Sequence, residues 1–157
     1  MQNQPIHVLL VEDNPGDARF VREMAREVPD LDIHHVDRLA AGIEYLAAQK
    51  VDVILLDLGL PDSQGLETLR AILKSGCAAP VVVLTGQDDE AVGQAAVREG
   101  AQDYLIKGRV AEHALTRAVR YAIERKRAEE ALRDSEKKYR TLVVVPEKAR
   151  FQAAAIA

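Results

Sequence analysis

The chain has 157 residues, of which 48% are hydrophobic and 29% are charged, and its formal net charge is −4. This composition is typical of a soluble globular protein, and the acidic balance gives no indication of nucleic-acid binding. There is no apolar run that could span a bilayer and no signal peptide, and the single cysteine excludes an internal disulfide. We therefore expect a cytoplasmic protein with one compact domain and a short appendage.

Five stretches have the pattern of strands in a parallel sheet. Residues 8–11, 53–56 and 81–84 are uninterrupted aliphatic runs, as expected for strands that are covered on both faces. Residues 33–36 and 104–106 have more polar neighbours and are predicted to lie at the sheet edges. Segments with helical spacing separate the strands, so the sequence predicts an α/β fold with a doubly wound five-stranded parallel sheet.

The predicted helices differ in how much apolar surface they offer. Asn14 and Pro15 form a helix start, because Asn caps a first turn and Pro has no N–H to lose there. The segment 88–99 is helical but offers mainly Val92, Ala95 and Ala96 for burial. The other three helices have apolar faces formed by Ala18, Val21, Ala25 and Val28; by Leu39, Ile43 and Leu46; and by Leu66, Leu69 and Leu73.

The last third of the chain predicts one long helix. From Val110 to about Leu142 there is no Gly and no Pro, and Pro146 is expected to end the helix. A first apolar stripe, which can pack on the sheet, consists of Ala111, Leu115, Val119 and Ala122. A second stripe has the alternating spacing of a coiled coil and consists of Ala114, Ala118, Tyr121, Arg125, Ala128, Leu132, Ser135, Tyr139 and Leu142.

This second stripe favours a helix that pairs with another helix. A helix of this length is about 50 Å long, so it cannot bury its whole stripe on its own domain. The dense mixture of both charge signs in residues 124–140 is typical of exposed coiled-coil flanks. The alternative is a solvated single helix held by ion pairs between residues four positions apart.

Polar side chains follow four of the predicted strands at the point where each strand ends. Glu12 and Asp13 follow the first strand, Asp57 the third, Thr85 the fourth and Lys107 the fifth. In a parallel sheet these ends lie at one edge, where open α/β sheets bind their ligands. We therefore expect three carboxylates to converge, with Thr85 and Lys107 beside them.

The expected acidic cluster indicates a metal ion and phosphate chemistry. Three carboxylates repel one another unless a cation offsets their charge. Oxygen ligands without a neighbouring His or thiolate favour Mg²⁺, which shares its shell with water and phosphate oxygens. Asp57 is the candidate nucleophile that accepts a phosphoryl group, with Thr85 and Lys107 to stabilise charge. The four histidines of the sequence show no metal-ligand spacing.

In combination, the stretches VLLVEDNPGD, VILLDLGLPDSQGLE, VVVLTG and GAQDYLIKG resemble the receiver domain of two-component response regulators. The resemblance covers about residues 6–123 and implies a flavodoxin-like fold with strand order 2-1-3-4-5. It implies a phosphohistidine donor on a sensor histidine kinase or a histidine phosphotransfer domain. The domain would be a phosphoacceptor rather than an enzyme, although it would contribute to its own phosphorylation and dephosphorylation.

The resemblance also implies roles for individual residues. The Mg²⁺ ligands would be Asp13, Asp57, the backbone carbonyl of Gly59 and, largely through water, Glu12. The phosphoryl group would be carried by Asp57 and bound by Thr85 and Lys107. Tyr104 would change rotamer on phosphorylation, although packing alone also explains an aromatic residue in an edge strand.

Three glycines depart from the usual pattern of the family. Gly108 follows Lys107 where the family usually has Pro, so the loop is expected to be freer there. Gly59 and Gly86 stand where larger side chains often screen the phosphoryl group. We therefore expect easy access of water and a short-lived phosphoaspartate.

The stretch YAIERKRAEEALRDSEKKYRTLV resembles the helix that joins receiver domains to PAS domains in hybrid sensor kinases. We predict a receiver domain at residues 1–123, a coiled-coil signalling helix at 124–145 and an unassigned tail at 146–157. The chain is then the front portion of a longer protein or a stand-alone relic of one. The helix is the candidate site of a homodimer.

Three other functions fit parts of the sequence. A flavodoxin-like FMN carrier would need a Ser/Thr/Gly-rich phosphate loop in place of Glu12 and Asp13. An aspartyl-phosphate hydrolase would need a second carboxylate at position 59, which is Gly. The alternative that stays open is a degenerate receiver that acts only as a docking or dimerisation module.

Overall fold

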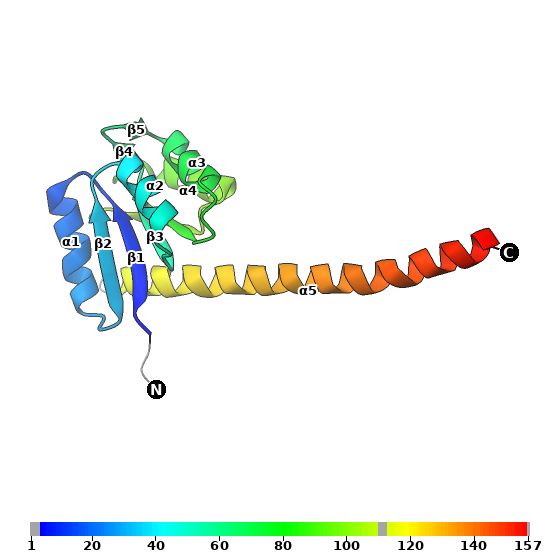
Figure 1. The fold of residues 1–157 in the computed structure, drawn as a ribbon. Helices are drawn as coiled ribbons and strands as arrows, with labels where there is room; N and C mark the ends of the chain where they lie inside the picture. The colour runs from blue at the N-terminus through cyan, green and yellow to red at the C-terminus, as the bar shows by residue number, and fades with distance from the viewer. Residues whose placement is uncertain (1–3, 110–112, 157) are drawn as a thin grey trace. The chain divides into compact units, whose positions relative to one another are not determined.

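A computed structural model describes residues 4–109 and 113–156, with side chains for 4–109 and 113–140. The main sheet has five parallel strands: β1 (Ile6–Val11), β2 (Leu31–Val36), β3 (Val53–Asp57), β6 (Val81–Thr85) and β7 (Asp103–Ile106). Their order is β2-β1-β3-β6-β7, which confirms the predicted topology and the two predicted edge strands (Figure 1).

A short antiparallel hairpin follows β3. Its strands, β4 (Gly59–Leu60) and β5 (Ser63–Gln64), were not predicted from the sequence. Figure 1 shows this hairpin at the end of the sheet to which the arrowheads of the strands point. It therefore borders the edge where the polar residues of the strand ends lie.

Five helices complete the fold: α1 (Pro15–Arg26), α2 (Leu39–Ala48), α3 (Leu66–Lys74), α4 (Glu90–Glu99) and α5 (Ala114–Ile156). The chain divides into two compact units, Met1–Glu124 and Arg125–Ala157. The first unit contains the sheet, α1 to α4 and the beginning of α5. In the part of the chain that the structure describes, no helix combines the length and the apolar character that a membrane span requires.

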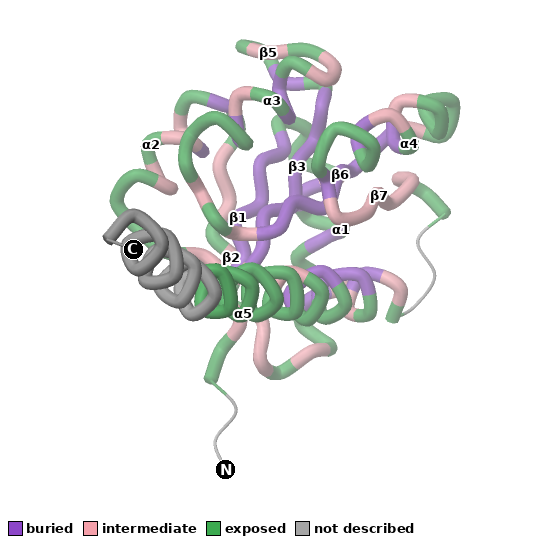
Figure 2. The backbone as a smooth tube through the Cα atoms, turned by 90° about the vertical axis from the view of Figure 1, so that its right-hand side faces the viewer, coloured by how far each residue is buried: buried purple, intermediate pink, exposed green. Residues whose placement is uncertain are grey.

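The two faces of the sheet are covered by different helices, because successive side chains of a strand point to opposite faces. Leu56 and Val83 pack on one face with residues of α2, α3 and α4. Leu55 and Val82 pack on the other face with residues of α1 and the start of α5. Figure 2 shows that buried residues are concentrated in β1, β3 and β6, in the middle of the sheet.

The start of α1 agrees with the prediction. Asn14 is the N-cap, and its Oδ1 accepts hydrogen bonds from the backbone N–H groups of Gly16 (2.9 Å) and Asp17 (3.1 Å). Pro15 occupies the first helical position, where its missing N–H costs nothing. This cap determines where the first turn of α1 lies relative to the end of β1.

The apolar face of α3 differs by one position from the expected one. Thr68, Leu69 and Ile72 are buried, whereas Leu73 is 37% exposed. The buried arc is centred on Ile72, so Leu73, one residue further round the helix, reaches only its margin. The expectation that Leu73 belongs to the core face is therefore wrong.

The beginning of α5 lies later than expected. The helix begins at Ala114, after His113, which has a φ of 72° and forms a turn. Residues 110–112, including the predicted stripe member Ala111, lie outside the described residues. The other members of the first stripe, Leu115, Val119 and Ala122, are buried as predicted. Ala118, a member of the second stripe, is also buried.

The end of α5 also differs from the prediction. The helix continues through Pro146 to Ile156, so the expectation that Pro146 ends it is wrong. A proline inside a helix removes one backbone hydrogen bond and costs about 3 kcal/mol. The residues that follow it are rich in Ala, Glu, Lys, Arg and Gln, which have high helix propensity and favour continuation of the helix.

Candidate functional site

The structure brings the three acidic residues of the strand ends together. One carboxylate oxygen each of Glu12, Asp13 and Asp57 lies within 4.8 Å of the others. This follows from the register of β1 and β3, in which Val11 pairs with Leu56, so that the next residue of each strand lies at the same edge. Glu12 is fully buried, Asp57 is 8% exposed and Asp13 is exposed. The cluster is thus buried at one side and open at the other.

Lys107 reaches the same cluster from the end of β7. Its ammonium lies 2.6 Å from Glu12 Oε2 and 3.1 Å from Asp57 Oδ2. A third carboxylate, Asp17 Oδ2 in the first turn of α1, also lies 3.1 Å from it. The first two neighbours were predicted from the sequence, whereas Asp17 was not. Three carboxyl groups therefore share one ammonium.

Thr85 lies at the end of β6 and is buried. Its backbone carbonyl accepts a hydrogen bond from the N–H of Lys107 at 2.7 Å. Its hydroxyl donates a long hydrogen bond of 3.5 Å to the carbonyl of Leu105. A bond of this length is weak, so the hydroxyl can turn to a better acceptor at little cost.

Glu12 is held through its side chain by its own loop and through its backbone by β2. The N–H of Asn14 donates to Glu12 Oε1 at 3.1 Å. His35 Nε2 lies 2.7 Å from the backbone carbonyl of Glu12 and must be the donor, because a carbonyl only accepts. This contact of His35 with the site was not predicted from the sequence. Glu12 Oε2 makes no aligned hydrogen bond with any residue that the structure describes, and its close neighbour is the ammonium of Lys107.

The electrostatics show an excess of negative charge. Burial, and then the neighbouring carboxylate of Asp57, raise the pKa of Glu12 from 4.5 to about 8. Burial disfavours the charged form of Lys107, but the neighbouring Glu12 and Asp57 outweigh it and raise the lysine pKa above its ordinary value. The protein groups alone therefore favour an additional proton in the cluster. A set of oxygen donors with this charge fits a hard divalent cation such as Mg²⁺.

The loop after β3 forms one wall of the site. The N–H of Gly59 donates to Asp57 Oδ1 at 3.1 Å. A Cβ atom at position 59 would lie 3.9 Å from Asp57 Oδ1 and 3.9 Å from Gln64 Oε1, which is ordinary van der Waals contact. A side chain would therefore fit here without a clash, and the glycine leaves one side of the Asp57 carboxylate uncovered.

The same loop is tied to α2 by Asp62. Its two carboxylate oxygens accept the N–H groups of Leu39 and Ala40, each at 2.9 Å. These bonds cap α2, whose own N-cap residue, Arg38, makes no side-chain cap. This long-range cap was not predicted, because nothing local to α2 indicates it.

The loop after Lys107 contains the glycine that departs from the family pattern. Gly108 has a φ of 84°, a conformation that favours glycine. A Cβ atom there would lie 2.7 Å from Gln87 Nε2. Gly108 therefore suits both the backbone conformation and the close approach of Gln87.

Tyr104 lies against α4. A Cβ atom added at Gly93 would lie 2.5 Å from Tyr104 Cδ2, so the ring occupies the space that a side chain at position 93 would need. The hydroxyl of Tyr104 donates to Glu90 Oε1 at 3.4 Å. Tyr104 is half-buried, and its ring packs on α4.

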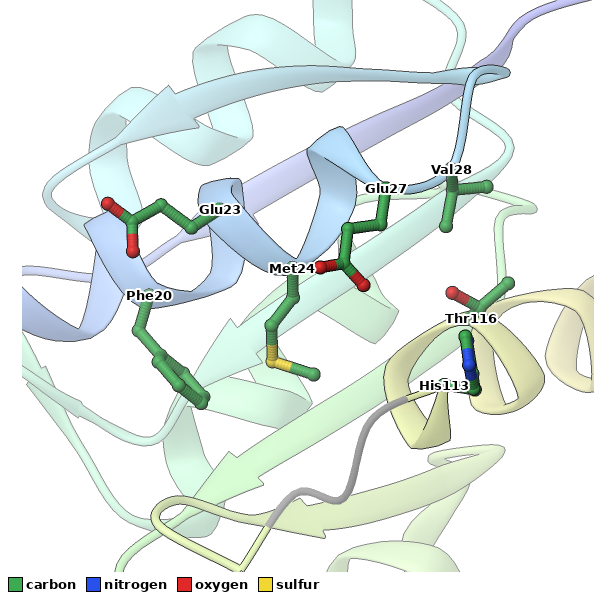
Figure 3. Close-up of a pocket in the computed structure, with 7 residues that line it drawn as sticks. All are labelled: Phe20, Glu23, Met24, Glu27, Val28, His113 and Thr116. Carbon is green, nitrogen blue, oxygen red and sulfur yellow. The ribbon is translucent and has the colours of Figure 1, made fainter.

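A separate hollow lies between α1 and the start of α5, with a volume of about 320 Å³. Figure 3 shows Phe20 and Met24 of α1 on one side of it and His113 and Thr116 on the other. Glu23, Glu27 and Val28 complete its lining. Within the described residues, the only group of three or more potential metal ligands is the one at the strand ends.

A doubly wound parallel sheet with an acidic cluster and a lysine at its carboxyl edge is the arrangement of a phosphoacceptor signalling domain. The family model described as "Response regulator receiver domain" matches residues 8–120. The chain therefore belongs to the receiver family of two-component systems, whose members bind Mg²⁺ at an acidic pocket and interact with histidine kinases or phosphotransfer proteins.

Similar proteins are found among curated sequences. The KDP operon transcriptional regulatory protein KdpE of Escherichia coli is 41% identical over 101 residues, which are 64% of this chain and 44% of that protein. The response regulator MprA of Mycobacterium bovis is 30% identical over 144 residues, which are 90% of this chain and 60% of that protein. This chain thus matches about half the length of these relatives.

Solved structures show the same fold. One of them is the receiver domain of the sensor histidine kinase PA1611 from Pseudomonas aeruginosa, which has a magnesium ion coordinated in its active site cleft. It is 26% identical to this chain, with a TM-score of 0.65, and the match covers 76% of this chain and 98% of that one. A response regulator receiver domain protein from Clostridium thermocellum is 26% identical, with a TM-score of 0.68 and coverage of 78% and 98%.

Proposed function

We propose that Asp57 accepts a phosphoryl group from a phosphohistidine of a sensor histidine kinase or a histidine phosphotransfer domain, in a reaction that requires Mg²⁺. The observation that carries this proposal is the convergence of Asp57 with Glu12, Asp13 and Lys107 at the carboxyl edge of the sheet. The magnesium ion in the similar receiver domain of PA1611 supports the choice of metal.

The chemistry is an in-line displacement at phosphorus. A carboxylate oxygen of Asp57 forms the new P–O bond while the P–N bond to the donor imidazole breaks and its electron pair returns to the ring nitrogen. The metal, held by Asp13, Asp57, the Gly59 carbonyl and Glu12, would supply positive charge to the phosphoryl oxygens.

Two side chains of this site act on the phosphoryl group. Lys107 lies 3.1 Å from Asp57 Oδ2 and offsets the negative charge of the phosphoryl group. Thr85, whose present hydrogen bond to Leu105 is long, turns its hydroxyl to a phosphoryl oxygen. In this proposal the move of Thr85 opens space for Tyr104, which leaves α4 and changes rotamer.

A binding experiment separates this function from the docking-only alternative. Beryllofluoride, a mimic of the phosphoryl group, should bind the wild type in the presence of Mg²⁺ and should not bind Asp57→Ala. Asp32→Ala is the matched control, because Asp32 is exposed and its partner His7 lies at the other end of the sheet. Equal behaviour of the wild type and Asp57→Ala would support the docking-only receiver instead.

The phosphorylation state is transmitted, in our proposal, through α5. We assign the receiver domain to residues 1–123 and the signalling helix to residues 124–145, and the division of the chain at Glu124 supports this boundary. In the second unit, Leu132 is 63% and Tyr139 69% exposed, which fits a helix that pairs with a second copy.

Sedimentation tests the pairing of the helices. We expect the fraction of dimer to change when Mg²⁺ and beryllofluoride are added, and we expect Leu132→Glu to abolish the dimer without loss of beryllofluoride binding. An unchanged monomer, with and without the mimic, would contradict this output and would leave the phosphoacceptor chemistry intact.

A further inference from the structure

Asp17 is a fourth acidic residue at the site, and it lies apart from the metal-ligand cluster. Its Oδ2 accepts a hydrogen bond from Lys107 Nζ at 3.1 Å, across 90 positions of the chain. The first turn of α1 holds it, because its N–H donates to the capping oxygen of Asn14. Asp17 is therefore placed on Lys107 by the start of a helix and not by a flexible loop.

The three carboxylates around Lys107 have different tasks. Glu12 and Asp57 belong to the group whose oxygens converge for a cation, whereas Asp17 does not. A divalent cation bound by that group repels the ammonium and competes with it for the same two carboxylates. Of the three carboxylates that contact Lys107, Asp17 is the one outside the candidate ligand group.

The lysine side chain needs such an anchor. Its stem has four methylene groups and many rotamers, and it lines a small cavity of about 40 Å³ together with Phe20, Met24 and Leu105. Gly108, which follows it, offers no side chain to restrict the stem. The ion pair with Asp17 selects a rotamer in which the ammonium is also 3.1 Å from Asp57.

We propose that Asp17 is a positioning residue for the phosphoryl reaction: it keeps the ammonium of Lys107 beside Asp57 while the metal is bound, so that Lys107 meets the phosphoryl group. This inference rests on the proposed function of Asp57. The ammonium has three donors and lies 3.1 Å from both Asp17 and Asp57, so contact with Asp17 does not withdraw Lys107 from the reaction.

The affinity for beryllofluoride at saturating Mg²⁺ tests this role. We expect Asp17→Asn to weaken binding of the mimic by about three- to tenfold, as loss of one partly exposed charged contact does. Binding of Mg²⁺ alone should stay close to wild type, and Asp17→Glu should restore most of the affinity for the mimic. Glu23→Gln, on the same helix and paired with Arg19, is the control and should bind as the wild type does.

Repeating the measurement in the Lys107→Ala variant tests whether Asp17 acts through Lys107. In Lys107→Ala, the further change Asp17→Asn should have no effect on binding of the mimic. The inference is overturned if Asp17→Asn binds like the wild type, if it loses Mg²⁺ and mimic affinity by the same factor, or if its effect persists in Lys107→Ala. Failure of the wild type itself to bind the mimic would instead refute the proposed function, so the two failures are distinguishable.

Discussion

The middle of the sheet and its β7 edge differ in how tightly they are packed. Every residue of β3 and β6 is buried, and this burial extends to Asp57 and Thr85 at their ends. All residues of β7 are only half-buried, and α4 beside it buries just Gly93 and Ala96. In our proposal, Asp57 and Thr85 thus act from tightly packed strands, whereas the region proposed to respond to phosphorylation is the more loosely packed one, which can move at low cost.

Truncation of leucines in the two regions should have the largest effect. Leu55 of β3 is 1% exposed, so Leu55→Ala should lower the free energy of unfolding by about 2–5 kcal/mol. Leu105 of β7 is half-buried, so Leu105→Ala should cost about 1 kcal/mol. Urea unfolding monitored by circular dichroism gives both values, and equal losses would mean that the edge is packed as tightly as the middle.

The contact between Tyr104 and α4 makes a second prediction about the edge. Gly93→Ala places a Cβ atom at 2.5 Å from the present position of the ring, so the ring must leave α4. We expect a loss of about 1–2 kcal/mol in unfolding free energy and a change in the NMR signals of Tyr104 like that produced by beryllofluoride.

The effect of Gly93→Ala on stability should change sign when the ring of Tyr104 is removed. In Tyr104→Ala, the change Gly93→Ala should stabilise the protein by up to about 1 kcal/mol, because Ala has a higher helix propensity than Gly. If Gly93→Ala destabilises both backgrounds equally, the ring is not what occupies the space beside Gly93.

Substitutions at Gly59, beside Asp57, should have a smaller effect, and this effect is on the rate of dephosphorylation. Gly59→Met should cover the open side of Asp57 and slow the loss of the phosphoryl group several-fold, which corresponds to about 1 kcal/mol in the barrier. Gly59→Ala, which adds a Cβ only at van der Waals distance, should stay close to the wild-type rate. A time course of dephosphorylation measures both, and identical rates for all three proteins would contradict the idea that Gly59 admits water.

Most of the fold and the core of the candidate site could be predicted from local sequence. Aliphatic runs indicated the buried strands, helical spacing indicated the α/β order, and Asn14 and Pro15 marked the start of α1. Glu12, Asp57 and Lys107 could be found because each lies at the carboxyl end of a strand or directly after it, and the ends of parallel strands meet at one edge. These features depend on patterns within a few residues, or on a rule that holds for any such sheet.

Other features were decided only by the tertiary structure. The hydrogen bond from His35 to the Glu12 carbonyl and the cap that Asp62 provides for α2 join residues 23 or 22 positions apart. The ion pair of Asp17 with Lys107 joins residues 90 positions apart. Such contacts depend on the exact placement of a helix or loop against the sheet, which no local pattern encodes. The sequence by itself therefore determined which groups gather at the sheet edge, and the packing of helices and loops decided which partners hold them there.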